Sequence, residues 1–218
     1  MQEIAILFDM DGVIAHTNPY HSKAFEAFFD KHNISYSLAQ FEEHMYGKHN
    51  SYIMSHFFGR KIEGDELIDL EKEKEGLFRD IYAQHVKDIP GYIDFLKSLK
   101  QEKVKTAVAT SAPRANMDLI VDALNIRNMM DSFMSSEDVE KHKPDPEIYL
   151  KSAAKLHIPK ERCIVFEDSF SGVSAAINAK MKVVGVLSSH SKNELPPCDL
   201  YISDYTEIQL HSLLNLID

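Results

Sequence analysis

The chain has 218 residues, of which 44% are hydrophobic and 27% are charged, and its formal net charge is −10. A chain of this length can bury roughly 70% of the surface that its unfolded form exposes, so it can form one large domain or two smaller ones. The negative charge argues against nonspecific binding to nucleic acid and against attachment to acidic membranes.

Apolar runs of strand length alternate with helical patterns along the chain. The first run, at 3–9, is continuous, which is typical of a central parallel strand buried on both faces. Further strands are expected at 104–109, 132–135, 162–167, 182–187 and 199–202. Helical periodicity follows at 91–102, 114–124, 145–157, 170–180 and 206–217. This alternation predicts an α/β fold with a doubly wound, mostly parallel, Rossmann-like sheet.

The segment between the first two strands differs from the rest. It contains no convincing strand, and helical patterns cover residues 18–32, 37–45, 48–58 and 64–86. An all-helical block inserted after one strand of a sheet indicates a second, smaller domain. We therefore expect a discontinuous core formed by residues 1–15 and 87–218, and a helical domain at 16–86.

Cysteine content and the N-terminal sequence predict the compartment. Cys163 and Cys198 are the two thiols, and Cys163 lies in a strand-like apolar run, so a disulfide framework is not indicated. The first residues lack the basic and apolar regions of a signal peptide, and no run approaches membrane-spanning length. We expect a cytoplasmic protein that binds neither membranes nor nucleic acid.

Two carboxylates, Asp9 and Asp11, follow the first buried strand, and Gly12 then allows a sharp turn. Two acids at the tip of a buried strand are costly unless something compensates their charge, and a bound cation is the usual compensation. In open α/β sheets, ligands bind beyond the carboxyl ends of the strands. The pair is therefore a candidate catalytic site.

The other strand ends carry side chains that suit a phosphate group and a cation. Thr110 and Ser111 follow the second strand, Lys143 precedes a helix, and Glu167 and Asp168 end the fourth strand. Each has an ordinary alternative, as a helix cap or a surface charge. Together they combine carboxylate oxygens, which suit Mg²⁺, with hydroxyl and ammonium donors for phosphate oxygens. The set predicts phosphoryl transfer.

These motifs resemble those of the haloacid dehalogenase-like phosphohydrolases, in the branch of β-phosphoglucomutases and sugar phosphatases. The resemblance covers nearly the whole chain and runs in order through Asp9-Met10-Asp11-Gly12-Val13, Thr110, Lys143-Pro144-Asp145-Pro146 and Glu167-Asp168-Ser169. It implies that the helical block at 16–86 is a cap that closes over the site and reads the substrate. It also implies a monomer.

The resemblance implies a role for each motif. Asp9 would attack phosphorus to form an aspartyl-phosphate, and Asp11 would act as general acid and base and offer its backbone carbonyl to Mg²⁺. Thr110 and Lys143 would hold the phosphoryl oxygens. Mg²⁺ would be bound by Asp9 and Asp168, with Glu167 binding it directly or through water.

In the cap, the resemblance points to His21 and to one loop. His21 lies where this branch often has a histidine just after the hinge. The substrate loop of β-phosphoglucomutases resembles Lys-Gly-x-x-Arg, whose arginine holds the phosphate that is not transferred. Its counterpart here is Tyr46-Gly47-Lys48-His49-Asn50. Asparagine cannot replace a bidentate arginine clamp.

The sequence therefore favours a Mg²⁺-dependent phosphatase of a small phosphorylated metabolite, with a sugar phosphate as the expected substrate. An isomerase of the β-phosphoglucomutase type is the first alternative, and a sensor of phosphorylated metabolites without turnover is the second. A two-component receiver domain also uses clustered aspartates with lysine and threonine, but it would not need the helical insert.

Overall fold

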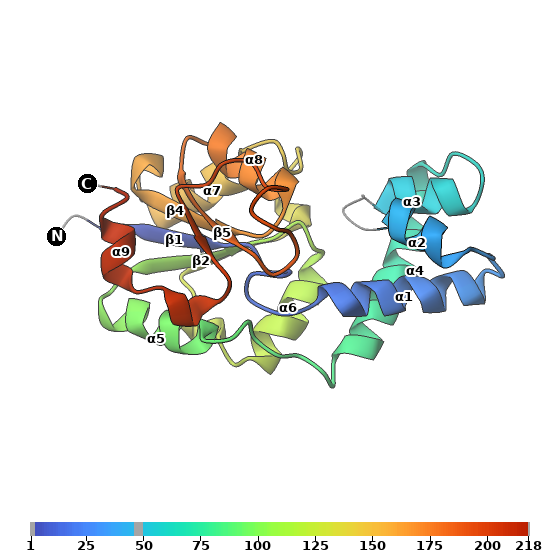
Figure 1. Ribbon diagram of the computed structural model, residues 1–218, viewed down its shortest axis with the longest axis horizontal. Coiled ribbons are helices and arrows are strands. Elements are labelled where there is room, and N and C mark those ends of the chain that lie inside the picture. Colours follow the sequence, from blue (N-terminus) through green and yellow to red (C-terminus); the bar gives the residue numbers. More distant parts are fainter. Residues whose placement is uncertain (1–2, 46–49, 218) are drawn as a thin grey trace. The chain divides into compact units, whose positions relative to one another are not determined.

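A computed structural model describes residues 3–45 and 50–217 (Figure 1). The chain divides into two compact units. Met1–His16 and Val86–Asp218 form a unit built around a sheet, and Thr17–His85 form an all-helical unit. Among the residues described, no helix combines the length and the apolar character needed to cross a bilayer.

The sheet has six parallel strands in the order β3-β2-β1-β4-β5-β6. Their bounds are Ala5–Phe8 (β1), Lys105–Ala109 (β2), Ser132–Met134 (β3), Cys163–Glu167 (β4), Lys182–Val186 (β5) and Leu200–Ile202 (β6). The first strand of the chain thus lies in the middle of the sheet, between β2 and β4, and its four residues are all buried. The predicted doubly wound α/β fold is confirmed.

Helices and short 3₁₀ turns connect these strands. The helices of this unit are α5 (Tyr92–Gln101), α6 (Arg114–Ala123), α7 (Glu147–Leu156), α8 (Phe170–Asn178) and α9 (Leu210–Leu214). The 3₁₀ turns are η1 (Arg127–Met129), η2 (Ser136–Asp138), η3 (Lys160–Arg162) and η4 (Tyr205–Glu207).

Neighbouring residues of β1 pack into hydrophobic clusters on opposite faces of the sheet. Leu7 packs in a cluster that includes Tyr149 of α7 and Val173 of α8. Phe8, the next residue, lies against the rings of Tyr92 and Phe166, at centroid distances of 5.3 and 5.2 Å. Because neighbouring residues of a strand point to opposite faces, both faces of the sheet are covered by apolar side chains.

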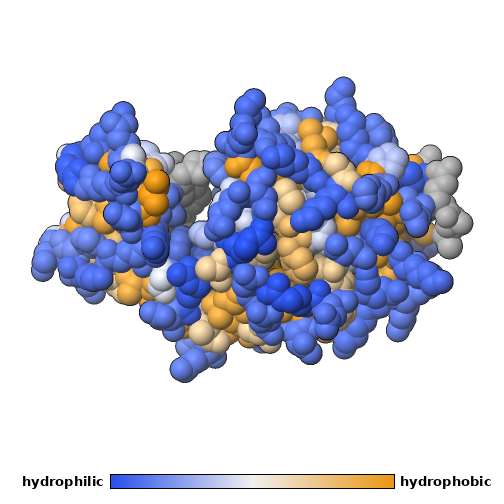
Figure 2. Space-filling view, turned by 180° about the vertical axis from the view of Figure 1, so that it is seen from behind, coloured by the Kyte–Doolittle hydropathy of each residue, from blue (hydrophilic) through white to orange (hydrophobic). Residues whose placement is uncertain are grey.

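The helical unit contains α1 (Asn18–Lys31), α2 (Leu38–Met45), α3 (Asn50–Phe57) and α4 (Gly64–Tyr82). Its core is rich in aromatic side chains and includes Phe25, Phe28, Phe29, Phe41, Ile53 and Met54. The unit therefore has a hydrophobic core of its own. Hydrophilic residues cover most of the molecular face drawn in Figure 2, with smaller apolar patches between them.

The last predicted helix, at 206–217, is wrong in extent. The carboxylate of Asp204 accepts hydrogen bonds from the backbone N–H and the hydroxyl of Thr206, at 2.8 and 2.5 Å, and starts the turn η4. Ile208 then adopts an extended conformation, and its side chain is buried. The α-helix is therefore confined to Leu210–Leu214.

Candidate active site

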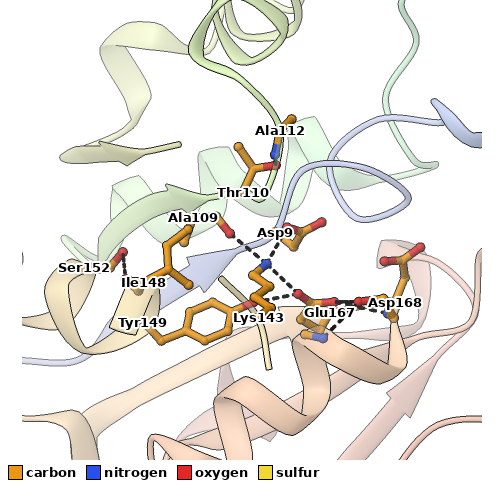
Figure 3. A network of polar contacts seen from close by, with 12 residues as sticks. Asp9, Ala109, Thr110, Ala112, Lys143, Ile148, Tyr149, Ser152, Glu167 and Asp168 are labelled. Carbon is orange, nitrogen blue, oxygen red and sulfur yellow. Dashed lines mark hydrogen bonds and ion pairs between the residues drawn. The ribbon is translucent and has the colours of Figure 1, made fainter. Parts of the chain in front are cut away.

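The site lies where three adjacent strands end. Asp9 follows β1, Thr110 follows β2, and Glu167 and Asp168 stand at the end of β4. Because β1 pairs with both β2 and β4 in parallel, their carboxyl ends meet at one edge of the sheet. The structure therefore brings together residues that are far apart in the sequence (Figure 3).

Lys143 connects the two acidic strand ends. Its ammonium donates to Asp9 Oδ1 at 2.6 Å, to Glu167 Oε1 at 2.7 Å and to the carbonyl oxygen of Ala109 at 3.1 Å. These contacts match the three protons of an ammonium group. The side chain is only 5% exposed, and the ammonium lies 4.9 Å from the centroid of the Tyr149 ring. Lys143 is thus part of a buried charge network and does not lie on the surface.

Glu167 is fully buried, and both of its carboxylate oxygens accept hydrogen bonds. Oε1 accepts from Lys143 and, at 2.7 Å, from the hydroxyl of Tyr149. Oε2 accepts from the N–H groups of Asp168 and Ser169 and from the Ser169 hydroxyl, at 3.0, 3.1 and 3.0 Å. A Cβ atom at Gly172 would overlap this carboxylate, so α8 approaches it closely through glycine.

Three carboxylates converge and fit a hard divalent cation. One oxygen from each of Asp9, Glu167 and Asp168 lies within 4.8 Å of the others. Carboxylate oxygens are the ligands that Mg²⁺ prefers, and it commonly uses one or two of them together with water and substrate phosphate. The donor set therefore fits the expected Mg²⁺.

The electrostatics of the site favour uptake of positive charge. Burial raises the pKa of Asp9 well above its usual value, although Lys143 opposes the rise, and the other carboxylates add to it. Burial and the charge of Glu167 raise the pKa of Asp168 to about 7. Burial disfavours the Lys143 ammonium, but Asp9 and Glu167 reverse this effect and raise the pKa of Lys143. A cation would stabilise the ionised carboxylates.

Asp11 lies in a tight turn. The N–H of Ile14 donates to the carbonyl oxygen of Met10 at 2.9 Å, and Gly12 has a φ of +72°, which favours glycine. A Cβ atom at Gly12 would also overlap the carboxylate of Asp168. The close approach of the Asp11 turn to the end of β4 thus depends on glycine at this position.

Thr110 and Ser111 differ in their surroundings. Thr110 is fully buried, and its hydroxyl oxygen accepts a hydrogen bond from the N–H of Ala112 at 3.0 Å. Ser111 is exposed. Neither side chain caps α6, whose N-cap residue is Pro113.

His21 and Asn50, predicted in the cap, belong to one polar network of the helical unit. Lys74, which is 2% exposed, donates to His21 Nδ1 at 2.9 Å and to Glu75 Oε1 at 2.8 Å. Asn50 donates to the same Glu75 oxygen at 3.2 Å. The His21 ring also stacks on Phe78, with 3.9 Å between centroids. The other predicted loop residues, Tyr46, Gly47, Lys48 and His49, lie outside the described residues.

Four residues at the site are missing from the sequence prediction. Tyr149 holds Glu167, but in the sequence it is one more apolar position of a helix that follows Lys143. Ser188, Ser189 and His190 contact the Asp11 turn and Asp168. Small polar residues after a strand carry no periodic signal, so only their position after β5, at the same sheet edge, could have indicated them.

Comparisons with known proteins identify the family to which the chain belongs. Residues 6–186 match the family model described as haloacid dehalogenase-like hydrolase. The chain is 29% identical, over 87% of each sequence, to a phosphorylated carbohydrates phosphatase of Thermotoga maritima. It is 26% identical to the chloroplastic 5-amino-6-(5-phospho-D-ribitylamino)uracil phosphatase of Arabidopsis thaliana, spanning 99% of this chain but only 58% of that protein's length.

Among solved structures, a hydrolase of Entamoeba histolytica from the same superfamily (family IA, variant 3) matches this fold closely. It superimposes with a TM-score of 0.91 and 27% sequence identity over 99% of both chains. The similarity therefore includes the helical unit as well as the sheet unit.

Proposed function

Because this chain belongs to the haloacid dehalogenase-like hydrolases and is a phosphoric monoester hydrolase, we propose that it cleaves a small phosphorylated carbohydrate with Asp9 as nucleophile and Mg²⁺ as cofactor. The family match confirms the resemblance indicated by the four motifs. The observation that carries the proposal is the buried convergence of Asp9, Lys143, Glu167 and Asp168 at one sheet edge.

In this proposal, Asp9 is the nucleophile and Asp11 is the general acid and base. An oxygen of Asp9 attacks phosphorus, the ester P–O bond breaks, and Asp11 gives its proton to the departing sugar oxygen. Asp11 then takes a proton from water as that water attacks phosphorus, and the bond between phosphorus and Asp9 breaks. Phosphate leaves, and both aspartates return to their starting forms.

The surrounding groups orient the nucleophile and balance charge. Lys143 fixes Asp9 Oδ1 and offers positive charge where phosphoryl oxygens gather, and Thr110 contributes to the same binding region. Asp9 and Asp168 would hold Mg²⁺ directly, and Glu167, whose two oxygens already accept hydrogen bonds, would act through water. Bound Mg²⁺ would reduce the repulsion between Asp9 and the phosphate dianion and would polarise the phosphoryl group.

The helical unit serves as the cap in this proposal and favours hydrolysis over isomerisation. Asn50 stands where the mutase loop has its phosphate-holding arginine, and its amide donates to the carboxylate of Glu75. The Asn50 amide is already bound to Glu75, whose charge is balanced by Lys74 at 2.8 Å, so a second phosphate beside Asn50 would lack the bidentate guanidinium clamp. A substrate with one phosphate suits this arrangement better than a bisphosphate intermediate.

The Asp9→Asn variant tests the nucleophile. We expect phosphatase activity in Mg²⁺ to fall by several orders of magnitude while the circular dichroism spectrum is unchanged. Rapid acid quench followed by mass spectrometry should detect a phosphorylated Asp9 peptide in the wild type. Asp94→Asn is the matched control, since the Asp94 side chain is 87% exposed. Retained activity in Asp9→Asn would overturn the assignment.

The substrate class is tested by turnover against a panel of sugar phosphates, nucleotides and pyrophosphate. We expect the highest kcat/KM for a sugar monophosphate. With β-glucose 1-phosphate and a bisphosphate activator, hydrolysis should exceed isomerisation, and efficient formation of glucose 6-phosphate would instead support the mutase.

A further inference from the structure

Three consecutive side chains in the loop after β5 contact the two acidic loops of the site. The Ser188 hydroxyl donates to the carbonyl oxygen of Gly12 at 2.5 Å. The Ser189 hydroxyl donates to Asp168 Oδ2, and Nδ1 of His190 lies 2.9 Å from the carbonyl oxygen of Asp168. This segment, Ser188–His190, therefore joins the turn after β1 to the end of β4.

The packing around Gly12 makes these contacts specific. A Cβ atom added at Gly12 would overlap the Asp168 carboxylate and would lie only 2.8 Å from the Ser189 hydroxyl oxygen. The carboxylate and the hydroxyl thus pack so closely on Gly12 that a carbon atom added at this glycine would not fit. Ser189 is nevertheless exposed, so its hydroxyl acts at the rim of the site and is not a core contact.

We propose that Ser189 is a positioning residue that holds the Asp168 carboxylate in the orientation required for cation binding. Ser188 and His190 anchor the segment on either side, through the backbone carbonyls of Gly12 and Asp168. The inference deepens the proposed function, because it rests on Asp168 being a ligand of Mg²⁺.

Without a hydrogen bond to hold it, the Asp168 carboxylate could rotate about its Cβ–Cγ bond and would be poorly oriented for a cation. A hydroxyl that donates to Oδ2 fixes the plane of the Asp168 carboxylate and leaves Oδ1 available to a cation. Groups that orient a metal ligand in this way typically change metal affinity by about 10–100-fold when they are removed. Removal of an exposed hydroxyl should leave the fold intact.

The test compares Ser189→Ala with Ser189→Thr and with the control Ser191→Ala. Ser191 lies in the same loop and donates to a carboxylate, Glu194 Oε2, at 2.6 Å, away from the catalytic loops. The first readout is the Mg²⁺-induced rise in Tm of EDTA-treated protein, which reports binding without turnover. The second is the Mg²⁺ concentration that gives half-maximal phosphatase activity.

We expect Ser189→Ala to need about tenfold more Mg²⁺ in both assays, with an unchanged Tm in the absence of metal. Ser189→Thr, which keeps the hydroxyl, should restore binding, and Ser191→Ala should match the wild type. Wild-type Mg²⁺ affinity in Ser189→Ala, or an equal loss in Ser191→Ala, would overturn the inference alone. A wild-type protein that Mg²⁺ neither stabilises nor activates would overturn the proposed metal site as well.

Discussion

Replacement of Lys143 by methionine tests whether the ammonium group is the element that makes the acidic site stable. Methionine has nearly the same length but no charge, so the change removes the contacts to Asp9 at 2.6 Å and to Glu167 at 2.7 Å. Both carboxylates would then be buried near each other without their cation. The exposed fractions of the three side chains are 4%, 10% and 0%, so water offers little compensation.

The expected decrease in the free energy of unfolding is large for a single substitution. Removal of one partner from a buried ion pair typically lowers the free energy of unfolding by about 3–5 kcal/mol. For a chain of this length, each kcal/mol changes Tm by about 2–4 °C, so Lys143→Met should lower Tm by roughly 6–20 °C. The loss should shrink as pH falls, because the pKa of Asp9 is raised in the folded state and its protonation removes the uncompensated charge.

Urea unfolding of metal-free protein, followed by circular dichroism at several pH values, measures this loss. Lys151→Met is the matched control on the same region of chain, because the Lys151 side chain is 48% exposed and its pair with Glu147 contributes little. The control should change the free energy of unfolding by less than about 1 kcal/mol. A Lys143→Met protein as stable as wild type near neutral pH would refute the reasoning.

Other measurements address the remaining carboxylates. Because the pKa of Asp168 is raised to about 7, its proton competes with Mg²⁺, and the Mg²⁺-induced rise in Tm should be larger near about pH 8 than near about pH 6. Tyr149→Phe removes the 2.7 Å hydrogen bond to Glu167 and should lower the free energy of unfolding by about 1.5–3 kcal/mol; an unchanged urea midpoint would contradict this. Gly172→Ala should displace Glu167 and greatly reduce kcat, with folding checked by circular dichroism.

The strand-end residues could be predicted from sequence because their chemistry and their position are both local features. A buried apolar run identifies each strand, and parallel pairing brings its last residues to the common edge, so Asp9 and Asp168 could be expected at one site. The partners of these residues could not be predicted in the same way. Tyr149 has the apolar spacing of any buried helical residue, and only packing shows that its hydroxyl reaches Glu167.

Two other features depend on contacts that local patterns do not encode. Ser189 has no periodicity that distinguishes it from Ser191 nearby, yet only Ser189 donates to Asp168. The end of the chain reads as one amphipathic helix, but the turn at Asp204 and the burial of Ile208 interrupt it. In both cases, tertiary contacts outweigh local preference.

The central place of β1 has a consequence for biosynthesis. This strand leaves the ribosome before both of its neighbours, which begin at Lys105 and Cys163, so its second edge stays unpaired until β4 has been synthesised. Such non-local pairing slows folding. Until β4 emerges, Asp9 stands on an open strand edge without Glu167 and Asp168. The nascent chain therefore gains its catalytic acids as a set only after β4 has been synthesised.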